Sequence, residues 1–282
     1  MNDKTISFIL KENLLNLELK DEASKTDLQS IICDVLNVDR AYLYLYGDKV
    51  LIDIQVEEIE KKIFRYTQGE PLAYILGYKH FWKQKIFVNQ HTLIPRADTE
   101  TLIEAVLNDY PNKNEALDIL DLGTGSGAIA IALAAEYPNS NVIAVDFSKE
   151  ALKQSEINAN QNNVDNIKFI ESDWYENLAK YKFDIIVSNP PYIDIEDSEI
   201  NDEVKKYEPH SALFANDGGL ADIELIISKA QNFLKNSNGK LYIEHGYTQS
   251  EVIYKLFANA GFLDIRVIKD LNGRDRVSIA RK

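Results

Sequence analysis

The chain has 282 residues, of which 45% are hydrophobic and 27% are charged, and its formal net charge at pH 7 is −14. This length is sufficient for one large domain or two smaller ones, each with its own core. An acidic chain without a stripe of Lys and Arg is poorly suited to neutralising phosphates, so the composition disfavours nucleic acid as a partner.

The cysteine content and the apolar runs indicate the compartment in which the protein works. Cys33 is the only cysteine, which excludes an internal disulfide, and the four histidines show no metal-ligand spacing. The N-terminal apolar patch, residues 6–10, is too short for a signal peptide, and no later run approaches a membrane span. We therefore expect a cytoplasmic protein with no bound metal and no membrane contact.

The first 75 residues are predicted to be helical. Apolar residues recur there at steps of three and four positions, first across residues 6–17 and again across residues 28–35. Asp39 is placed to cap a short third helix over residues 42–46, and a fourth helix is expected from about residue 56 to residue 67. No two-residue alternation interrupts this pattern, so residues 1–75 are predicted to form a small helical domain.

Residues 76–98 follow a different pattern. Short β-like runs between Phe81 and Val88 predict a β-hairpin, and we interpret residues 76–98 as a linker built on it. Asp98 or Thr99 is then expected to cap a helix that continues through Asn108.

Residues 99–282 alternate strands with helices. The expected strands cover residues 117–122, 142–146, 167–172, 184–188 and 240–244, and the expected helices lie near residues 129–136, 149–159, 219–234 and 250–260. This alternation predicts an α/β domain with a Rossmann-like, mostly parallel sheet and helices on both faces. The last two strands, residues 265–269 and 276–280, are joined by Asn272-Gly273 without a helix, which predicts an antiparallel hairpin at one edge of the sheet.

A glycine-rich turn follows the first of these strands, with the sequence Asp121-Leu122-Gly123-Thr124-Gly125-Ser126-Gly127. Glycine lets the backbone approach a ligand closely, and nucleoside cofactors bind at this place in open α/β sheets. NAD enzymes also use such a turn, but Asp121 and the third glycine, Gly127, are more typical of methyltransferases. Asp146, at the end of the second strand, is placed to accept hydrogen bonds from both hydroxyls of a ribose.

A second turn, Asn189-Pro190-Pro191-Tyr192, follows the fourth strand. The two prolines stiffen the turn and remove two hydrogen-bond donors in succession. The Asn189 side-chain oxygen and the Pro190 carbonyl are therefore expected to point outward as acceptors, which suits a planar nitrogen group that carries two N–H donors. Tyr192 can lie flat against the same plane. An ordinary proline-rich turn is the alternative interpretation.

The Asn-Pro-Pro-Tyr turn is similar to the motif of methyltransferases that act on planar amino groups, whether adenine N6, cytosine N4 or glutamine N5. From about residue 60 to the C-terminus, the chain resembles more specifically the PrmC (HemK) family of release factor glutamine methyltransferases. The matching stretches are residues 69–77, 81–82, 93–100, 172–174, 207–209 and 273–276. The sequence departs from the family pattern at Ala97, where proline is expected, and at His245, which interrupts a Glu-Gly pair.

The resemblance implies a class I methyltransferase fold with S-adenosylmethionine as the cofactor. It implies that the cofactor contacts include Trp174 in the adenine pocket, together with Asp121, Gly123, Thr124, Gly125, Ser126, Gly127, Asp146, Asp173 and Asn189. The implied substrate is the glutamine of the Gly-Gly-Gln loop in class 1 peptide chain release factors, held by Asn189, Pro190, Pro191 and Tyr192. Of these four residues, Asn189, Pro190 and Tyr192 would be catalytic.

The resemblance also implies that the helical domain grips the release factor away from the reacting amide, and we expect a monomer. Four alternatives stay open at this point. A glutamine methyltransferase of a ribosomal protein would share the same turn, as would a DNA adenine methyltransferase, which must flip its base out of a duplex. A regulatory protein that binds the cofactor without turnover and an NAD oxidoreductase are the other two.

Overall fold

The computed structural model describes residues 4–16, 22–196, 202–235 and 238–282. The chain forms two compact units, Met1–Gly77 and Tyr78–Lys282. Within the described residues, no helix is both long enough and apolar enough to cross a membrane.

The first unit is built from helices. They are α1 (Ile6–Asn16), α2 (Glu22–Leu36), α3 (Arg40–Leu45), α4 (Asp53–Thr67) and α5 (Leu72–Leu76). As predicted, Asp39 caps the third helix, because its side chain accepts a hydrogen bond of 2.9 Å from the Tyr42 N–H. The apolar residues at helical spacing meet in one core, which includes Ile6, Leu28, Ile32 and Ile59. The short helix α5 was not predicted.

A β-hairpin opens the second unit. Strands β1 (Tyr78–Phe81) and β2 (Gln84–Phe87) pair antiparallel. Asn158 holds the hairpin against helix α8 (Lys149–Gln161), because its side chain hydrogen-bonds both the N–H and the C=O of Phe87 at 2.8 and 2.9 Å. The predicted hairpin is therefore present, and it packs against the second unit.

A short 3-10 turn, η1 (Ala97–Thr99), leads into helix α6 (Glu100–Asp109). Thr99 occupies the N-cap position of α6, but its side chain makes no capping hydrogen bond. Of the two capping residues predicted, Asp98 or Thr99, the structure therefore rules out Thr99. Its hydroxyl instead accepts a hydrogen bond of 3.3 Å from the Asn189 side chain.

A seven-stranded sheet forms the centre of the second unit, in the order β10-β11-β9-β6-β3-β4-β5. The parallel strands are β3 (Asp118–Leu122), β4 (Asn141–Asp146), β5 (Ile167–Glu171), β6 (Ile185–Ser188) and β9 (Lys240–Glu244). Strand β11 (Asp275–Arg281) runs antiparallel to β9 and to the edge strand β10 (Leu263–Lys269). These pairings confirm the predicted mostly parallel sheet with an antiparallel hairpin at one edge.

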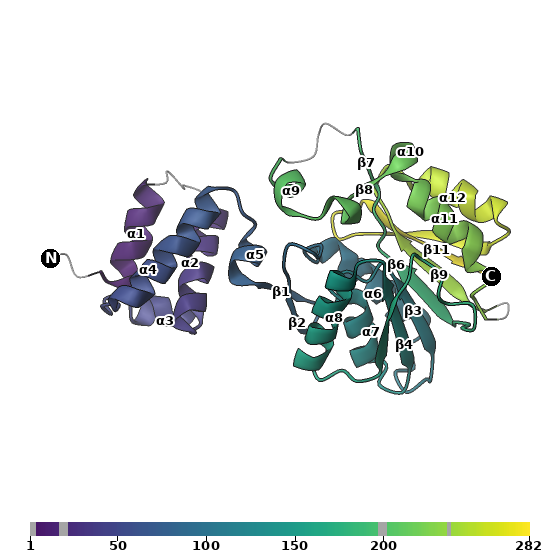
Figure 1. Cartoon of the computed structure of the whole chain (residues 1–282), viewed down its shortest axis with the longest axis horizontal. Coiled ribbons are helices and arrows are strands. Elements are labelled where there is room, and N and C mark those ends of the chain that lie inside the picture. Colours follow the sequence, from purple (N-terminus) through teal and green to yellow (C-terminus); the bar gives the residue numbers. More distant parts are fainter. Residues whose placement is uncertain (1–3, 17–21, 197–201, 236–237) are drawn as a thin grey trace. The chain divides into compact units, whose positions relative to one another are not determined.

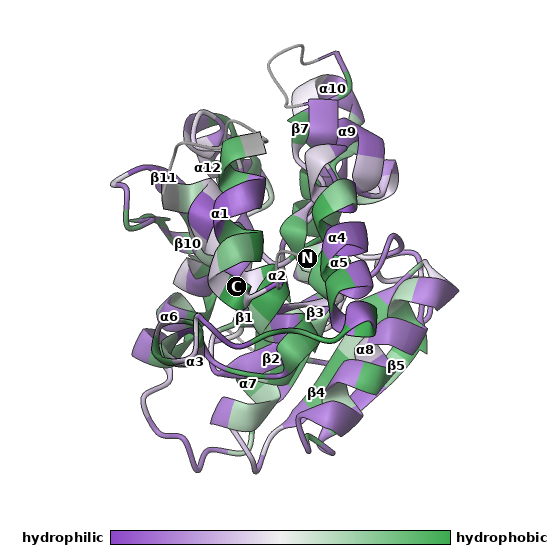
Figure 2. Cartoon of the chain, turned by 90° about the vertical axis from the view of Figure 1, so that its left-hand side faces the viewer, coloured by the Kyte–Doolittle hydropathy of each residue, from purple (hydrophilic) through white to green (hydrophobic). Residues whose placement is uncertain are grey.

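Helices cover both faces of this sheet (Figure 1). One layer contains α6, α7 (Ala128–Glu136) and α8, and the other contains α11 (Ala221–Ala230) and α12 (Ser250–Asn259). Alternate residues of β9 face the two helical layers. Tyr242 hydrogen-bonds Asp109 at the end of α6. Leu241 and Ile243 face the other layer and pack in the cluster that includes residues of α11 and α12. In Figure 2, β4 is largely green, whereas α8 mixes purple and green residues, as expected for a helix with one face toward solvent.

The connection between β6 and α11 contains several short elements that were not predicted. Strand β7 (Ile193–Asp194) pairs with β8 (Phe214–Ala215), and α9 (Asp202–Tyr207), η2 (His210–Ala212) and α10 (Asn216–Gly219) complete the connection. Glu208 fastens this segment to residues 94–96, as described below.

Candidate active site

The strand register brings the two predicted turns together. Leu122 at the end of β3 pairs with Val145 of β4 on one side and with Ser188 of β6 on the other. Strands β4 and β5 extend the sheet on one side of β3, and β6 and β9 extend it on the other. The strand order therefore reverses between β3 and β6, which is the place where open α/β sheets bind ligands. A cavity of about 480 Å³ lies there, a volume suited to a small-molecule ligand. Its wall includes residues 123–126, 146–148, 172–174 and Asn189.

The glycine-rich turn forms one wall of the cavity. Gly125 lines the cavity, and a Cβ added to it would meet no protein atom within 4 Å, so the turn leaves room there for a ligand. Gly127 has a different role, because an added Cβ would lie 2.9 Å from the Cβ of Ser155 on α8. The residue is absent from the cavity wall and instead allows two helices to approach closely.

Asp121 lies behind this wall. It is fully buried, accepts hydrogen bonds from the Thr124 hydroxyl at 2.6 Å and the Ala130 N–H at 3.2 Å, and does not line the cavity. Burial raises the pKa of Asp121 to about 7, although these hydrogen bonds favour the charged form. Asp121 therefore supports the turn, and the structure does not bring it to the position of a cofactor contact.

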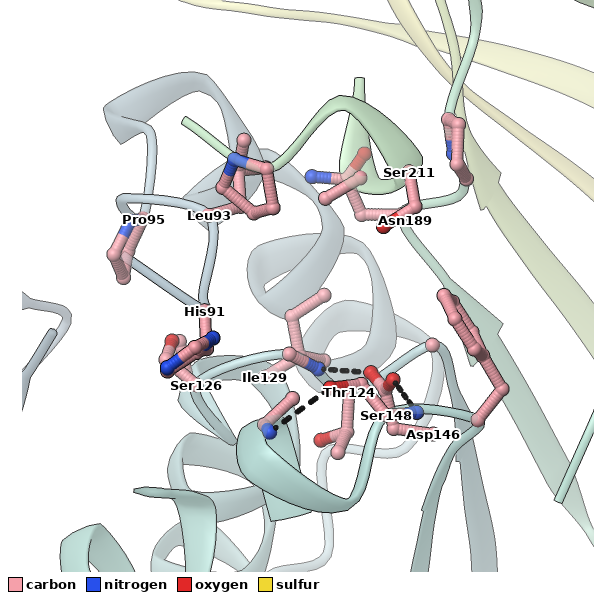
Figure 3. Close-up of a pocket in the computed structure, with 18 of the residues that line it drawn as sticks. His91, Leu93, Pro95, Thr124, Ser126, Ile129, Asp146, Ser148, Asn189 and Ser211 are labelled. Atoms are coloured by element: carbon pink, nitrogen blue, oxygen red, sulfur yellow. Dashed lines mark hydrogen bonds between the residues drawn. The ribbon is translucent and has the colours of Figure 1, made fainter. Parts of the chain in front are cut away.

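Asp146 faces the cavity from the end of β4 (Figure 3). One oxygen of its carboxylate accepts a hydrogen bond from the Gly125 N–H and the other accepts one from the Ser148 N–H, both at 2.9 Å. These bonds fix the direction of the carboxylate, and each oxygen keeps a further lone pair. Burial raises the pKa of Asp146, and the backbone hydrogen bonds oppose that rise. The geometry suits a ligand with two adjacent hydroxyls.

Trp174 forms a further part of the wall, next to Asp173. Its indole ring lies against Gly123. Burial raises the pKa of Asp222, and the neighbouring Trp174 side chain opposes the shift. Asp222 also lines the cavity, and no motif in the sequence marked it.

The Asn189-Pro190-Pro191-Tyr192 turn contributes to the wall unevenly. Asn189 and Pro191 line the cavity, whereas Pro190 and Tyr192 do not. The Tyr192 hydroxyl is directed at Glu244 instead, with 3.5 Å between the two oxygens, and burial raises the pKa of that hydroxyl. In Figure 3, Asn189 and Ser211 lie on one side of the cavity, and Asp146 and Thr124 lie on the other.

Leu93, Pro95 and Arg96, in the segment of residues 93–96, close another part of the wall. Glu208 holds them, because one oxygen of its buried carboxylate accepts from the Ile94 N–H at 3.1 Å and the other forms an ion pair with Arg96. The two segments are more than 100 positions apart in the sequence. Residues 93–100 and 207–209 were recognised as family stretches, but the sequence did not indicate that they meet.

The described parts of the chain hold no group of three or more His, Cys, Asp or Glu side chains placed to bind a metal ion.

This architecture defines a class I methyltransferase. It combines the mostly parallel sheet, the glycine-rich turn after β3, and the Asp146 carboxylate that the Gly125 and Ser148 N–H groups hold in place. The structure of a methyltransferase from Pyrococcus furiosus has the same fold, with a TM-score of 0.52 at 19% identity over 79% of this chain and 98% of that one. Two family models match, the methyltransferase small domain over residues 97–206 and the PrmC N-terminal domain over residues 14–77.

The full-length relatives identify the family. The release factor glutamine methyltransferase of Francisella tularensis subsp. tularensis is 55% identical over 281 residues, which is 100% of this chain and 99% of that protein. The release factor glutamine methyltransferase of Escherichia coli is 38% identical over 272 residues, 96% of this chain and 97% of that one. The chain belongs to the family of release factor glutamine methyltransferases, which confirms the resemblance seen in the sequence.

The family uses S-adenosylmethionine, and the residues present fit this cofactor. Asp146 offers a fixed carboxylate for the ribose hydroxyls, Trp174 offers an apolar ring for the adenine, and the turn at Gly125 leaves open space beside them.

Proposed function

We propose that this protein transfers the methyl group of S-adenosylmethionine to the side-chain amide nitrogen, N5, of the glutamine in the Gly-Gly-Gln motif of class 1 peptide chain release factors. The observation that carries this proposal is the position of Asn189. Its side chain lines the cavity opposite Asp146 and directs its nitrogen to Thr99, so its oxygen is available to a substrate amide.

The chemistry follows from the properties of an amide. The lone pair of an amide nitrogen is delocalised into the carbonyl, so the nitrogen is a poor nucleophile and needs accurate placement. When bound, S-adenosylmethionine supplies a methyl group on a positively charged sulfur. The Asn189 oxygen would accept a hydrogen bond from one N–H of the amide and help to hold the nitrogen in line with that methyl group.

The same oxygen would stabilise the positive charge that develops on the nitrogen. The nitrogen gains a methyl group and then releases one proton to water, so this scheme needs neither a metal ion nor a strong base. Tyr192 contributes by anchoring the end of the turn to Glu244.

We propose further that residues 1–75 recognise the release factor, that residues 76–98 connect them to the catalytic domain of residues 99–282, and that the enzyme works as a cytoplasmic monomer. Large apolar side chains are exposed between residues 44 and 54, which supports a protein-binding role for the first unit. They are Tyr44, Leu45, Tyr46, Val50, Ile52 and Ile54.

The test is incubation of the protein with S-adenosylmethionine and a class 1 release factor, followed by mass spectrometry of the peptide that contains Gly-Gly-Gln. We expect one added methyl group on the glutamine, and none when that glutamine is replaced by alanine. Methylation of a ribosomal protein with none on the release factor would overturn the proposed substrate. Binding of the cofactor without methylation of either protein would overturn the proposed activity.

A further inference from the structure

The Asn189–Tyr192 turn is held at its Tyr192 end by the side chain of Gln249. This glutamine occupies the N-cap position of α12, 57 positions further along the chain than Tyr192. Its Nε2 atom donates hydrogen bonds to the Tyr192 carbonyl at 3.0 Å and to the Gly218 carbonyl at 3.3 Å. Its Oε1 atom accepts a hydrogen bond of 2.9 Å from the Gly246 N–H. One side chain therefore joins the turn to α10 and to the segment that follows β9.

The orientation of the Gln249 amide follows from its backbone partners. A carbonyl can only accept a hydrogen bond and a backbone N–H can only donate one, so the NH₂ group must face Tyr192 and Gly218, and the oxygen must face Gly246. The backbone N–H of Gln249 also donates to the Gly246 carbonyl at 2.9 Å, which ties both the main chain and the side chain of Gln249 to one residue. No ionisable group takes part in these contacts.

The two prolines make the contact at Tyr192 important for the whole turn. Pro190 and Pro191 carry no N–H, so the backbone cannot be anchored through a donor at either position. Their rings also fix φ, which stiffens the turn, so a displacement at Tyr192 is passed on to Asn189. The hydrogen bond from Gln249 to the Tyr192 carbonyl therefore contributes to the position of the Asn189 side chain in the cavity wall.

Gly219 lies close against the same carbonyl. A Cβ added to Gly219 would be 2.1 Å from the Tyr192 carbonyl oxygen and 3.1 Å from the Gln249 Nε2 atom. Gly219 is buried, and the nearest atoms belong to the backbone of the turn, which cannot move aside as the end of a flexible side chain can. Glycine at this position therefore leaves the space in which the Tyr192 carbonyl reaches Gln249. Neither Gly219 nor Gln249 lines the cavity.

We propose that Gln249 is a positioning residue, which holds the Tyr192 carbonyl against Gly219 and thereby sets the position of Asn189 for methyl transfer. The inference rests on the proposed function for the identity of the substrate. The effect of Gln249 on the turn can nevertheless be measured without turnover, which separates the two claims.

The first experiment compares Gly219→Ala with the matched control Gly218→Ala. Both glycines have a left-handed backbone, with φ of +78° and +66°, so alanine is strained at either position. At Gly219 the new Cβ would also push the Tyr192 carbonyl by about 1 Å, whereas at Gly218 the nearest atom is the Asp194 Oδ2, 4.0 Å away. A misplacement of about 1 Å can cost up to 10²-fold in rate.

Single-turnover methylation of a release factor at saturating cofactor should therefore slow roughly tenfold or more in Gly219→Ala and stay close to wild type in Gly218→Ala. The affinity for S-adenosylmethionine, measured by calorimetry, should stay unchanged in both variants, because Asp146 and its contacts are untouched. An equal loss of rate in the two variants would assign the effect to backbone strain and would overturn the proposal.

Gln249→Glu makes the same test with little change of shape. It keeps an oxygen for Gly246 but replaces the NH₂ donor that faces Tyr192 with an acceptor. The rate should again fall roughly tenfold or more, on the scale of one lost hydrogen bond that leaves its partner unpaired. If Gln249 acts through Asn189, the change should add no further loss to Asn189→Ala. A wild-type rate in Gln249→Glu, or multiplied losses in the double variant, would overturn the proposal.

The final readout does not depend on activity. In the ¹⁵N-labelled protein, the side-chain NH₂ resonances of Asn189, assigned by their absence from Asn189→Ala, should shift in Gln249→Glu and stay in place in Gly218→Ala. Shifted resonances together with a wild-type protein that does not methylate the release factor would reject the proposed substrate and keep the positioning role. Unchanged resonances in Gln249→Glu would reject that role, whatever the activity.

Discussion

The turns that follow β3 and β6 are supported in the same way but from different places in the chain. Each is held from behind by a buried carboxylate, Asp121 for the first turn and Glu244 for the second. Burial raises the pKa of each to about 7, and each has one oxygen without a hydrogen-bond partner in the described part of the chain. Asp121 is three positions from its partner Thr124, whereas Glu244 is 52 positions from Tyr192.

The turn after β3 therefore depends on residues close to it in the sequence, whereas the turn after β6 depends on the assembled sheet. The residues that shape the first turn are neighbours in the sequence, so the turn can take its form once β3 is in place. The second turn acquires its contacts only when β9 has paired with β6 and α6 has packed beside it, because Glu244, the partner of Tyr192, and Thr99, the partner of Asn189, come from those elements. The following predictions test that division.

The largest expected effect is on catalysis at the second turn. Asn189→Ala should reduce turnover by about 10²-fold or more, the scale for loss of one preorganised polar group at a reacting centre. Cofactor affinity should stay near wild type, because Asp146 and the glycine-rich turn are unchanged. Single-turnover kinetics and calorimetry measure the two quantities, and an unaltered rate would remove Asn189 from the mechanism.

The two buried carboxylates should both make the second unit less stable as the pH rises. Below their ordinary pKa values near 4, Asp121 and Glu244 are protonated in both the folded and the unfolded states, so their burial costs little. Between about pH 4 and pH 7 the unfolded chain releases these protons while the folded protein keeps them, because the folded pKa values are about 7. The free energy of unfolding therefore falls as the pH rises through this window.

We expect each group to lower the free energy of unfolding by about 2 kcal/mol between pH 5 and pH 8. Asp121→Asn and Glu244→Gln should each flatten this decline. Urea unfolding followed by tryptophan fluorescence measures it, since both tryptophans, Trp82 and Trp174, belong to the second unit. A pH dependence in both variants equal to that of the wild type would show that neither carboxylate titrates as described.

Asp146→Ala at the first turn should weaken cofactor binding rather than catalysis. The carboxylate is placed for two charge-assisted hydrogen bonds to a ribose, each worth about 1.5–3 kcal/mol, so the affinity for S-adenosylmethionine should fall more than tenfold. The rate with saturating cofactor should change less than the affinity. Calorimetric titration gives the first quantity, and an unchanged dissociation constant would place the ribose elsewhere.

The smallest effect is expected outside both turns. Replacing the exposed Tyr44 and Leu45 by serine should raise the KM for the release factor several-fold through lost apolar contact, with kcat and cofactor affinity preserved. Lys61→Ser on the exposed surface of α4 is the matched control and should change neither constant. An unaltered KM in the Tyr44 and Leu45 variant would exclude this surface from release factor binding.

The sheet and its main helices were predictable because their apolar residues recur with a regular period over segments long enough to tell a strand from a helix. Strand β9 was predicted over residues 240–244 and is Lys240–Glu244, and the other sheet strands differ from their predicted bounds by at most two residues. The short elements between β6 and α11 were missed, since two-residue strands and single helical turns carry no periodic pattern. The predicted cap at Thr99 failed because η1 runs directly into α6, so Thr99 has helical backbone angles, φ −65° and ψ −22°, instead of the extended conformation of a capping residue.

The two turns, their places after β3 and β6, and the carboxylate at Asp146 were readable from the residue order, because each depends on residue types within a few positions of one another. Which side chains face the cavity depends on how the strands and helices pack in three dimensions. This packing placed Asp121 behind the wall, turned Tyr192 toward Glu244 and brought Thr99 to Asn189 from 90 positions away. Buried donors and acceptors form hydrogen bonds with the partners that packing brings close to them. In this site those partners come from strands and helices that are distant in the sequence.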